Sequence, residues 1–160
     1  MMEHDSLDRL IDYGIYIKNL STSDLVELIK RLENYEEVSS ALTELSQRDK
    51  TILIPLCHNI LQAELGDEYL QAIAFNLLYT SDREKAMEWV KVKLESVFTS
   101  VLGEIFDNLS TDSLQPFGLS LSSEFLQSLA DRYFDFSDDD KKRIYENYEW
   151  FKESYKDKLS

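Results

Sequence analysis

The residue types that most often carry nucleophilic or metal chemistry are scarce in this chain of 160 residues, which has one cysteine and two histidines. Cys57 and His58 are adjacent. Successive residues of a helix point about 100° apart, so His58 cannot serve as the general base for the Cys57 thiol. A zinc site needs further ligands, and the remaining histidine, His4, lies far away along the chain. We therefore expect a buried cysteine and a tolerated histidine here, with no bound metal.

Carboxylates are abundant, but their spacing indicates no particular site. The run Asp138-Asp139-Asp140 lacks the alternating spacing and the glycine of a calcium loop. Only four glycines occur, and they are too scattered to form a phosphate-binding loop. Among 31 acidic residues chance pairs of carboxylates are inevitable, and none is singled out. The sequence predicts no catalytic site and no cofactor, and an enzyme with an unrecognised carboxylate pair stays open as an alternative.

The formal net charge of −14 is the most unusual global property of the sequence. Such a charge repels nucleic acid and anionic lipid, and it raises the rate of encounter with a basic protein. The cluster Lys141-Lys142-Arg143 directly follows three aspartates, so it offers no basic face for DNA or RNA. We expect a basic protein partner and no nucleic acid. The alternative is that the charge serves solubility alone.

Two aromatic side chains near the C-terminus lie away from the apolar stripe of their helix. From the centre of that stripe, Trp150 lies about 130° away and Tyr145 about 85° away, whereas Trp89 on an earlier helix is expected in a core. Exposed Trp and Tyr among carboxylates are typical of binding hot spots. The predicted partner-binding site is Asp135, Asp138, Asp139, Asp140, Tyr145, Glu146, Glu149 and Trp150.

The compartment follows from what the sequence lacks. A single cysteine cannot form an intramolecular disulfide, which suits a reducing environment. No basic segment followed by an apolar run opens the chain, and no run approaches the roughly 18 apolar residues of a membrane span. We expect a cytoplasmic protein that does not enter the membrane.

The elements that would position these residues are helices. Apolar residues recur with a period of 3.6 almost throughout, and only 4 Gly and 2 Pro occur. We expect a single all-α domain over residues 1–160, with about seven to nine helices in stacked antiparallel pairs or an irregular bundle. Residues 109–123 read as a loop or broken short helix, and the first twenty residues as a helix. Pro55 is expected in the first turn of its helix, and one final helix is expected to open at Ser137.

One predicted helical sequence occurs twice in the chain. EYLQAIAFNLLYTSD, residues 68–82, and EFLQSLADRYFDFSD, residues 124–138, are identical at six of fifteen positions and similar at five more. A weaker match to the first copy lies 33 residues upstream, at residues 41–50. Helix pairs that cannot bury their apolar faces alone stack on their neighbours. The recurrence therefore predicts a scaffold of repeated helix pairs, with a more buried first copy and a more exposed, more acidic second copy.

A resemblance to HEAT-type helical repeats is found in the stretch SSALTELSQRDKTILIPLCHNILQAELGDEYLQAIAFNLLYTSDREKAMEWV. Each such repeat has a first helix with aliphatic residues, a short turn with Asp, and a second helix with Ala and Leu where the helices pack. The resemblance covers residues 36–94 and extends again over 124–155. In size, acidity and helicity the chain is also similar to the immunity proteins of bacterial contact-dependent inhibition and related polymorphic toxin systems. That similarity implies a partner that is a basic toxin domain, such as a nuclease.

These observations predict an inhibitor that binds a basic toxin and covers its active site through an acidic surface with aromatic anchors. The alternative is a short HEAT-like adaptor that holds a peptide or helix in its groove. A further alternative is mimicry of DNA, in which the same negative charge would bind a nucleic-acid-binding protein instead of a toxin. The oligomeric state is left open.

Overall fold

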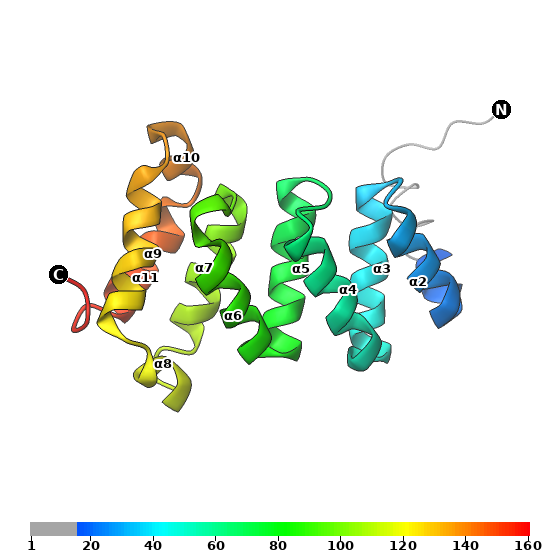
Figure 1. Cartoon of the computed structure of the whole chain (residues 1–160), viewed down its shortest axis with the longest axis horizontal. Coiled ribbons are helices and arrows are strands. Elements are labelled where there is room, and N and C mark those ends of the chain that lie inside the picture. The colour runs from blue at the N-terminus through cyan, green and yellow to red at the C-terminus, as the bar shows by residue number, and fades with distance from the viewer. Residues whose placement is uncertain (1–15) are drawn as a thin grey trace. The chain divides into compact units, whose positions relative to one another are not determined.

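The structure of the chain is a computed structural model that describes residues 16–160, and all of its regular elements in that part are helices (Figure 1). This confirms the predicted all-α class. The helices are α2 (Thr22–Arg31), α3 (Tyr35–Arg48), α4 (Lys50–Gln62), α5 (Glu68–Ser81), α6 (Arg83–Lys93), the 3-10 turn η1 (Leu94–Ser96), α7 (Thr99–Thr111), α8 (Pro116–Ser120), α9 (Ser123–Asp135), α10 (Asp138–Arg143) and α11 (Tyr145–Ser154). Eight of these have ten residues or more, which agrees with the seven to nine predicted. Of the first twenty residues, 16–19 are helical and Leu20 forms a bend, whereas residues 1–15 of that prediction lie outside the described residues.

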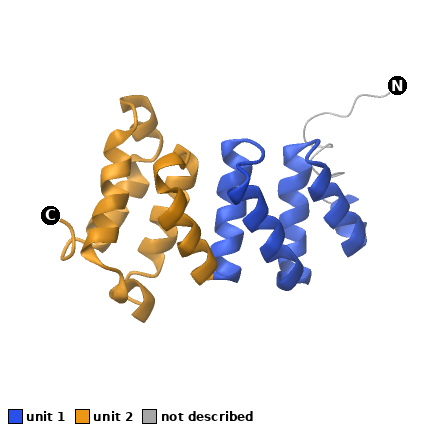
Figure 2. Ribbon diagram, in the orientation of Figure 1, with its two compact units in different colours: residues 1–82 blue, residues 83–160 orange. Residues whose placement is uncertain are grey.

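The chain divides into two compact units, residues 1–82 and residues 83–160 (Figure 2). The single domain expected over residues 1–160 stays a prediction. In unit 1, α3 packs against α2, α4 and α5, and α4 packs against α5. Fully buried leucines from α3, α4 and α5 fill the space between these helices: Leu42, Leu45, Leu53, Leu61, Leu70 and Leu78.

The turns of unit 1 follow from local side-chain chemistry. Asn34, Asp49 and Asp67 each precede a helix, and their side-chain oxygens accept hydrogen bonds from the backbone N–H three residues on. Such caps satisfy N–H groups that have no partner inside the helix. These caps fix the residues at which α3, α4 and α5 begin, and Ser21 caps α2 in the same way.

The expected position of Pro55 was wrong. It is the sixth residue of α4 and so lies in the second turn, not the first. The cap at Asp49 fixes the start of α4, because its Oδ1 accepts from the Ile52 N–H at 3.2 Å. Proline lacks an N–H, which leaves the carbonyl of Thr51 without its helical partner. Thr51 and Pro55 are both exposed, so water can donate a hydrogen bond to the Thr51 carbonyl oxygen.

Unit 2 has an aromatic core between α7, α9 and α11. The Phe106 ring of α7 stacks on Phe151 of α11 at 4.6 Å between centroids. Tyr133 of α9 stacks on Tyr148 of α11 at 4.1 Å. At the far end of α11 the buried Tyr155 hydroxyl donates to the Leu109 carbonyl at 2.6 Å. These contacts hold α9 and α11 against α7.

The single final helix expected from Ser137 was wrong, because the structure has two helices, α10 and α11, that meet at Ile144. Ile144 leaves the helical conformation with φ −123° and ψ 22°. It is buried against Gly103 of α7, where an added Cβ would lie 2.9 Å from Ile144 Cγ2. Arg143 fixes the same corner by donating to the Ser100 hydroxyl at 3.0 Å. A contact from a distant part of the sequence therefore sets the break.

The segment 109–123 contains the last turn of α7, a turn and the five-residue helix α8, which begins with Pro116. Gly118 of α8 lies so close to the backbone that an added Cβ would be 2.2 Å from the Asp112 carbonyl oxygen. Lys158 near the C-terminus donates to the carbonyls of Leu119 and Leu121. The short helix is therefore tied to the end of the chain.

The two copies of the repeated sequence form α5 and α9, and they differ in burial as predicted. Phe75, Leu78 and Tyr79 are buried in α5. Their counterparts in α9, Asp131, Phe134 and Asp135, are exposed. α5 is thus buried on two sides, whereas α9 buries one stripe, Leu126, Leu129, Ala130 and Tyr133, as the periodicity predicted. The second copy leaves a face with aromatic and acidic side chains free for solvent.

Candidate functional site

The side chains with nucleophilic potential are not arranged for chemistry in the described residues. Cys57 is buried in α4, and this burial raises the pKa of its thiol to about 12. A thiol with so high a pKa is a poor nucleophile at neutral pH. No group of three or more potential metal-ligating side chains occurs within residues 16–160. His4 lies outside the described residues.

The acidic run of the predicted site forms the first turn of α10. The Ser137 hydroxyl caps this helix by accepting from the Asp140 N–H at 3.2 Å. Asp138 pairs with Lys141 at 3.4 Å, and Asp140 pairs with Arg143 at 3.3 Å. With three acidic and three basic residues α10 has no net charge. The run therefore adds less negative potential than its sequence suggests.

The larger part of the net negative charge lies in unit 1, whereas the predicted site lies in unit 2. Residues 1–82 carry 15 Asp and Glu against 6 Lys and Arg, a net charge of −9. Residues 83–160 carry 16 against 11, a net charge of −5. Residues 1–82 therefore carry a larger net negative charge than the unit that contains the predicted site.

The two aromatic anchors of the predicted site lie on different sides of α11. Tyr145 and Trp150 are five residues apart, which separates them by about 140° around a helix. Trp150 follows Asn147 by one turn, and the Asn147 amide donates to Asp107 of α7 at 2.9 Å. Trp150 thus lies on the flank of α11 next to α7. Tyr145 and Glu149 are one turn apart on the flank that faces α9.

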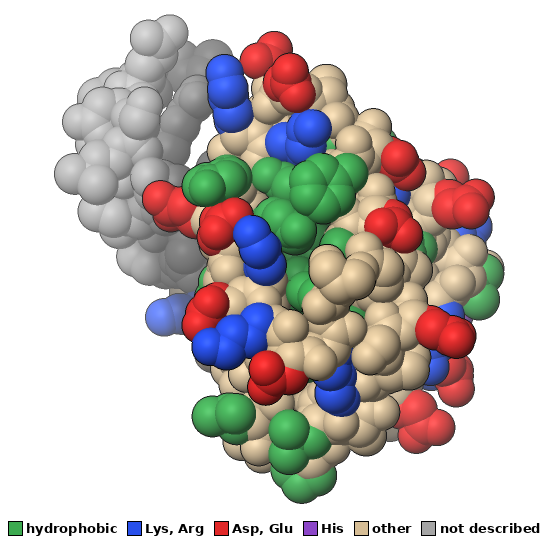
Figure 3. Space-filling view, turned by 90° about the vertical axis from the view of Figure 1, so that its left-hand side faces the viewer, with side chains coloured by type: hydrophobic (Ala, Val, Ile, Leu, Met, Phe, Trp, Pro, Cys, Tyr) green, Lys and Arg blue, Asp and Glu red, His purple; other side chains and the backbone are tan. Residues whose placement is uncertain are grey.

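Tyr145 and Glu149 belong to a surface that we call the α9–α11 face: Tyr133, Phe134, Tyr145, Tyr148 and Glu149. Phe134 of α9 contacts Tyr148 of α11 edge to face, with 5.5 Å between ring centroids. It also contacts Tyr133, at 5.3 Å. Although Tyr133 and Tyr148 are buried, Phe134 is 58% exposed and Tyr145 54% exposed. Figure 3 shows hydrophobic side chains gathered on this side of the molecule, with charged side chains around them.

A carboxylate lies beside the rings of this face. The pKa values of Tyr133 and Tyr148 are raised, first by burial and then by the negative charge of Glu149. Among residues 16–160 no Lys or Arg forms an ion pair with Glu149. The face therefore combines exposed aromatic surface with an uncompensated negative charge.

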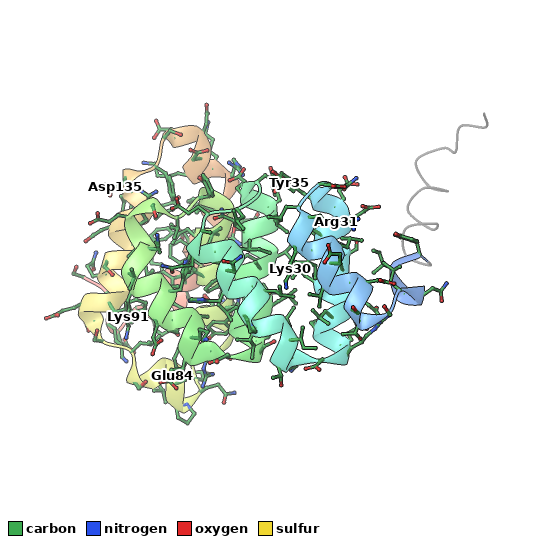
Figure 4. All side chains as sticks on the ribbon, turned by 45° about the vertical axis from the view of Figure 1, so that its right-hand side comes forward. Lys30, Arg31, Tyr35, Glu84, Lys91 and Asp135 are labelled. Atoms are coloured by element: carbon green, nitrogen blue, oxygen red, sulfur yellow. The ribbon has the colours of Figure 1, made fainter. Side chains whose placement is uncertain are left out.

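The remaining predicted residues lie around this face rather than on it. Asp135 ends α9 and points outward (Figure 4). Asp139 and Glu146 are exposed, and Trp150 is 48% exposed. Phe134 was missing from the prediction. The signal that could have found it is the repeat, because Phe134 occupies the position of the buried Leu78 without the second neighbour that covers α5.

A second surface that the sequence did not predict lies on unit 1. A cavity of about 360 Å³ opens beside α2 and the α2–α3 turn, where Arg31 and Tyr35 lie (Figure 4). Its lining includes four carboxylates and one cation: Asp24, Glu27, Glu33, Glu37 and Arg31. Arg31 pairs with Glu27 at 3.5 Å, and within residues 16–160 no ion pair is formed by the other three carboxylates.

A pair of half-buried carboxylates lies on α7. Glu104 and Asp107 are three residues apart and so share one side of the helix. Burial and the neighbouring Asp107 raise the pKa of Glu104. Burial raises the pKa of Asp107, although its hydrogen bond from Asn147 acts in the opposite direction. Within residues 16–160 no nucleophilic or basic side chain forms a hydrogen bond or ion pair with the Glu104 or Asp107 carboxylate, so the two acids indicate no particular reaction.

No helix within residues 16–160 has the length and apolar character needed to cross a membrane. Comparison of the chain with protein-family models, with curated proteins and with solved structures found no match.

Proposed function

We propose that this chain is a protein-binding inhibitor that neutralises a basic protein by covering its active site. The observation that carries the proposal is the α9–α11 face, where Phe134 and Tyr145 are more than half exposed on a chain of net charge −14. Large aromatic side chains exposed to water on a rigid scaffold are the usual anchors of protein interfaces. The immunity proteins of bacterial polymorphic toxin systems, which the chain resembles in size, acidity and helicity, act in this way in the cytoplasm.

The two properties have separate physical roles. Carboxylates spread over the surface speed the approach of a positively charged partner, and salt screens this effect. The aromatic rings slow dissociation once water leaves the contact. Phe134 is supported from below by Tyr133 and Tyr148, so little conformational entropy is lost when it is covered. The rings are therefore preorganised for binding in the unbound chain.

The experiment that tests this proposal is co-expression with the protein encoded by the neighbouring reading frame. If the proposal is correct, the neighbouring protein alone arrests growth, and this chain restores growth and forms a stable complex with it. A variant of the neighbour without its toxic activity should still bind, which separates binding from indirect rescue. Growth arrest that persists although both proteins accumulate in soluble form would contradict the proposal.

The alternative function is a short adaptor that binds a peptide or helix. The observation that favours it is the stacking of the α2–α3 and α4–α5 hairpins in unit 1, where α3 packs on α5. This arrangement supports the resemblance to HEAT-type repeats. Salt distinguishes the two functions, because association of a steered inhibitor slows steeply as ionic strength rises, whereas an apolar groove is little affected.

A further inference from the structure

Aromatic rings at the surface of unit 2 repeatedly lie beneath cations of the same chain. Arg83 lies 3.9 Å from the Phe117 centroid, and Arg132 lies 4.4 Å from that of Phe136. Lys91 of α6 (Figure 4) and Lys141 of α10 take similar places over two further rings, at 5.7 Å and 5.9 Å. The face of an aromatic ring attracts a cation through its quadrupole. Four rings of this unit therefore each have a cation over their face.

The α9–α11 face has one such place without a cation. Tyr145 is 54% exposed, and no Lys or Arg of residues 16–160 lies over its ring. Glu149 follows it by one helical turn, so the ring and the carboxylate are neighbours on the same flank of α11. Lys141 lies over Phe134 and pairs with Asp138. Lys152 follows Glu149 by three residues on α11, but it forms no ion pair with Glu149 among the described residues. A ring and a carboxylate therefore stand side by side without a positive charge between them.

We propose that the α9–α11 face receives an arginine side chain of the partner, which lies flat on the Tyr145 ring and pairs with the Glu149 carboxylate. Phe134 forms the apolar wall beside it. The planar guanidinium can stack on an aromatic ring and donate to a carboxylate at the same time, whereas the compact, strongly hydrated ammonium of lysine cannot. The inference rests on the proposed function for the basic character of the partner. Its contact chemistry can be tested without that partner.

The test uses capped hexa-arginine and hexa-lysine peptides as probes, titrated into the full-length chain while the aromatic side-chain signals are followed by NMR. We expect saturable shifts of the rings of Phe134, Tyr145 and Tyr148, with hexa-arginine binding at least about threefold more tightly than hexa-lysine. Tyr145→Ala and Glu149→Gln should each weaken hexa-arginine binding by about threefold or more. Tyr69→Ala and Glu36→Gln are matched controls on unit 1, at exposed positions, and should leave these ring shifts unchanged.

Several outcomes would overturn the inference. Equal affinity for the two peptides would remove the role of the guanidinium, and absence of binding would remove the site. Shifts confined to the acid-lined cavity beside α2 would move the contact to unit 1. Sedimentation of the chain as a dimer that Phe134→Ala converts to monomer would show that a second copy covers the face. If co-expression restores growth but the peptides fail, the inhibitor proposal stands and the arginine contact is wrong.

Discussion

Replacing Phe106 by alanine should destabilise unit 2 far more than replacing Phe134, although both rings belong to the same cluster. Phe106 is fully buried and lies against Tyr133, Tyr148 and Phe151 at centroid distances of 6.2, 5.7 and 4.6 Å. Truncating a buried phenylalanine to alanine costs about 3–5 kcal/mol. Phe134 is 58% exposed, so less than half of the roughly 1.5–3 kcal/mol of a fully buried large side chain is lost, about 1 kcal/mol.

The pair of variants is compared by thermal and urea unfolding followed by circular dichroism. A loss of about 1 kcal/mol corresponds to about 4–8 °C in melting temperature if unit 2 unfolds alone, and to about 2–4 °C if residues 1–160 unfold as one domain. Phe106→Ala should therefore lower the transition by at least about 12 °C in the first case and about 6 °C in the second, and Phe134→Ala by less than about 8 °C and about 4 °C. Equal losses in the two variants, or a loss near 1 kcal/mol for Phe106→Ala, would refute the burial pattern on which the α9–α11 face depends.

Three further predictions concern ionisable groups and cooperativity. Burial raises the pKa of Tyr155 to about 12, so the folded state keeps a proton that the unfolded state releases near pH 10. The free energy of unfolding should therefore fall between pH 10 and 12, and in urea titrations Tyr155→Phe should make this fall shallower. At pH 7 the same variant should cost about 1–3 kcal/mol, because the Leu109 carbonyl loses its hydrogen-bond donor. Burial and a neighbouring carboxylate raise the pKa of Glu104, so Glu104→Gln should raise the melting temperature at pH 7, with an advantage that shrinks as acid protonates the wild-type side chain; a lower melting temperature would contradict this. If residues 1–160 unfold as one domain, Leu42→Ala and Phe106→Ala shift the same calorimetric transition, whereas two transitions, each moved by one variant, would contradict the single-domain prediction.

The helices and their inward faces could be predicted because they depend on local periodicity. Ile144, Tyr148, Phe151 and Tyr155 recur at spacings of four, three and four residues, and all four are buried. The same spacing concealed the break at Ile144, since a kink that keeps the apolar side inward leaves the period unchanged. Its cause is the contact with Gly103, about forty residues upstream, which no local pattern contains.

The candidate site was predicted in part, for a geometric reason. The angular distance of a residue from the apolar stripe says that it is off the core, but not to which side it turns. Tyr145 and Trp150 both satisfied that criterion and lie on opposite flanks of α11. Trp89 lies similarly far from its stripe, yet it is buried, as expected for a helix covered on more than one side. Side and neighbour are properties of the packing between helices, which the periodicity of one helix does not determine.

The acidity of the predicted site was overestimated for a local reason. Lys141 and Arg143 follow Asp138 and Asp140 by three residues, which places each cation beside a carboxylate on the surface of α10. This pairing is readable from the sequence once the segment is known to be helical. The greater surplus of negative charge lies in residues 1–82.

The most direct test of the account is the affinity of the double variant Phe134→Ala/Tyr145→Ala for the partner identified by co-expression, measured by calorimetry beside wild type and Tyr69→Ala. Two hot-spot residues together contribute on the order of 3–4 kcal/mol, so the double variant should bind at least about 100-fold more weakly. Tyr69→Ala, which removes a 61% exposed tyrosine of unit 1, should bind as wild type does. Wild-type affinity in a double variant that remains folded would contradict the claim that the partner docks on the α9–α11 face.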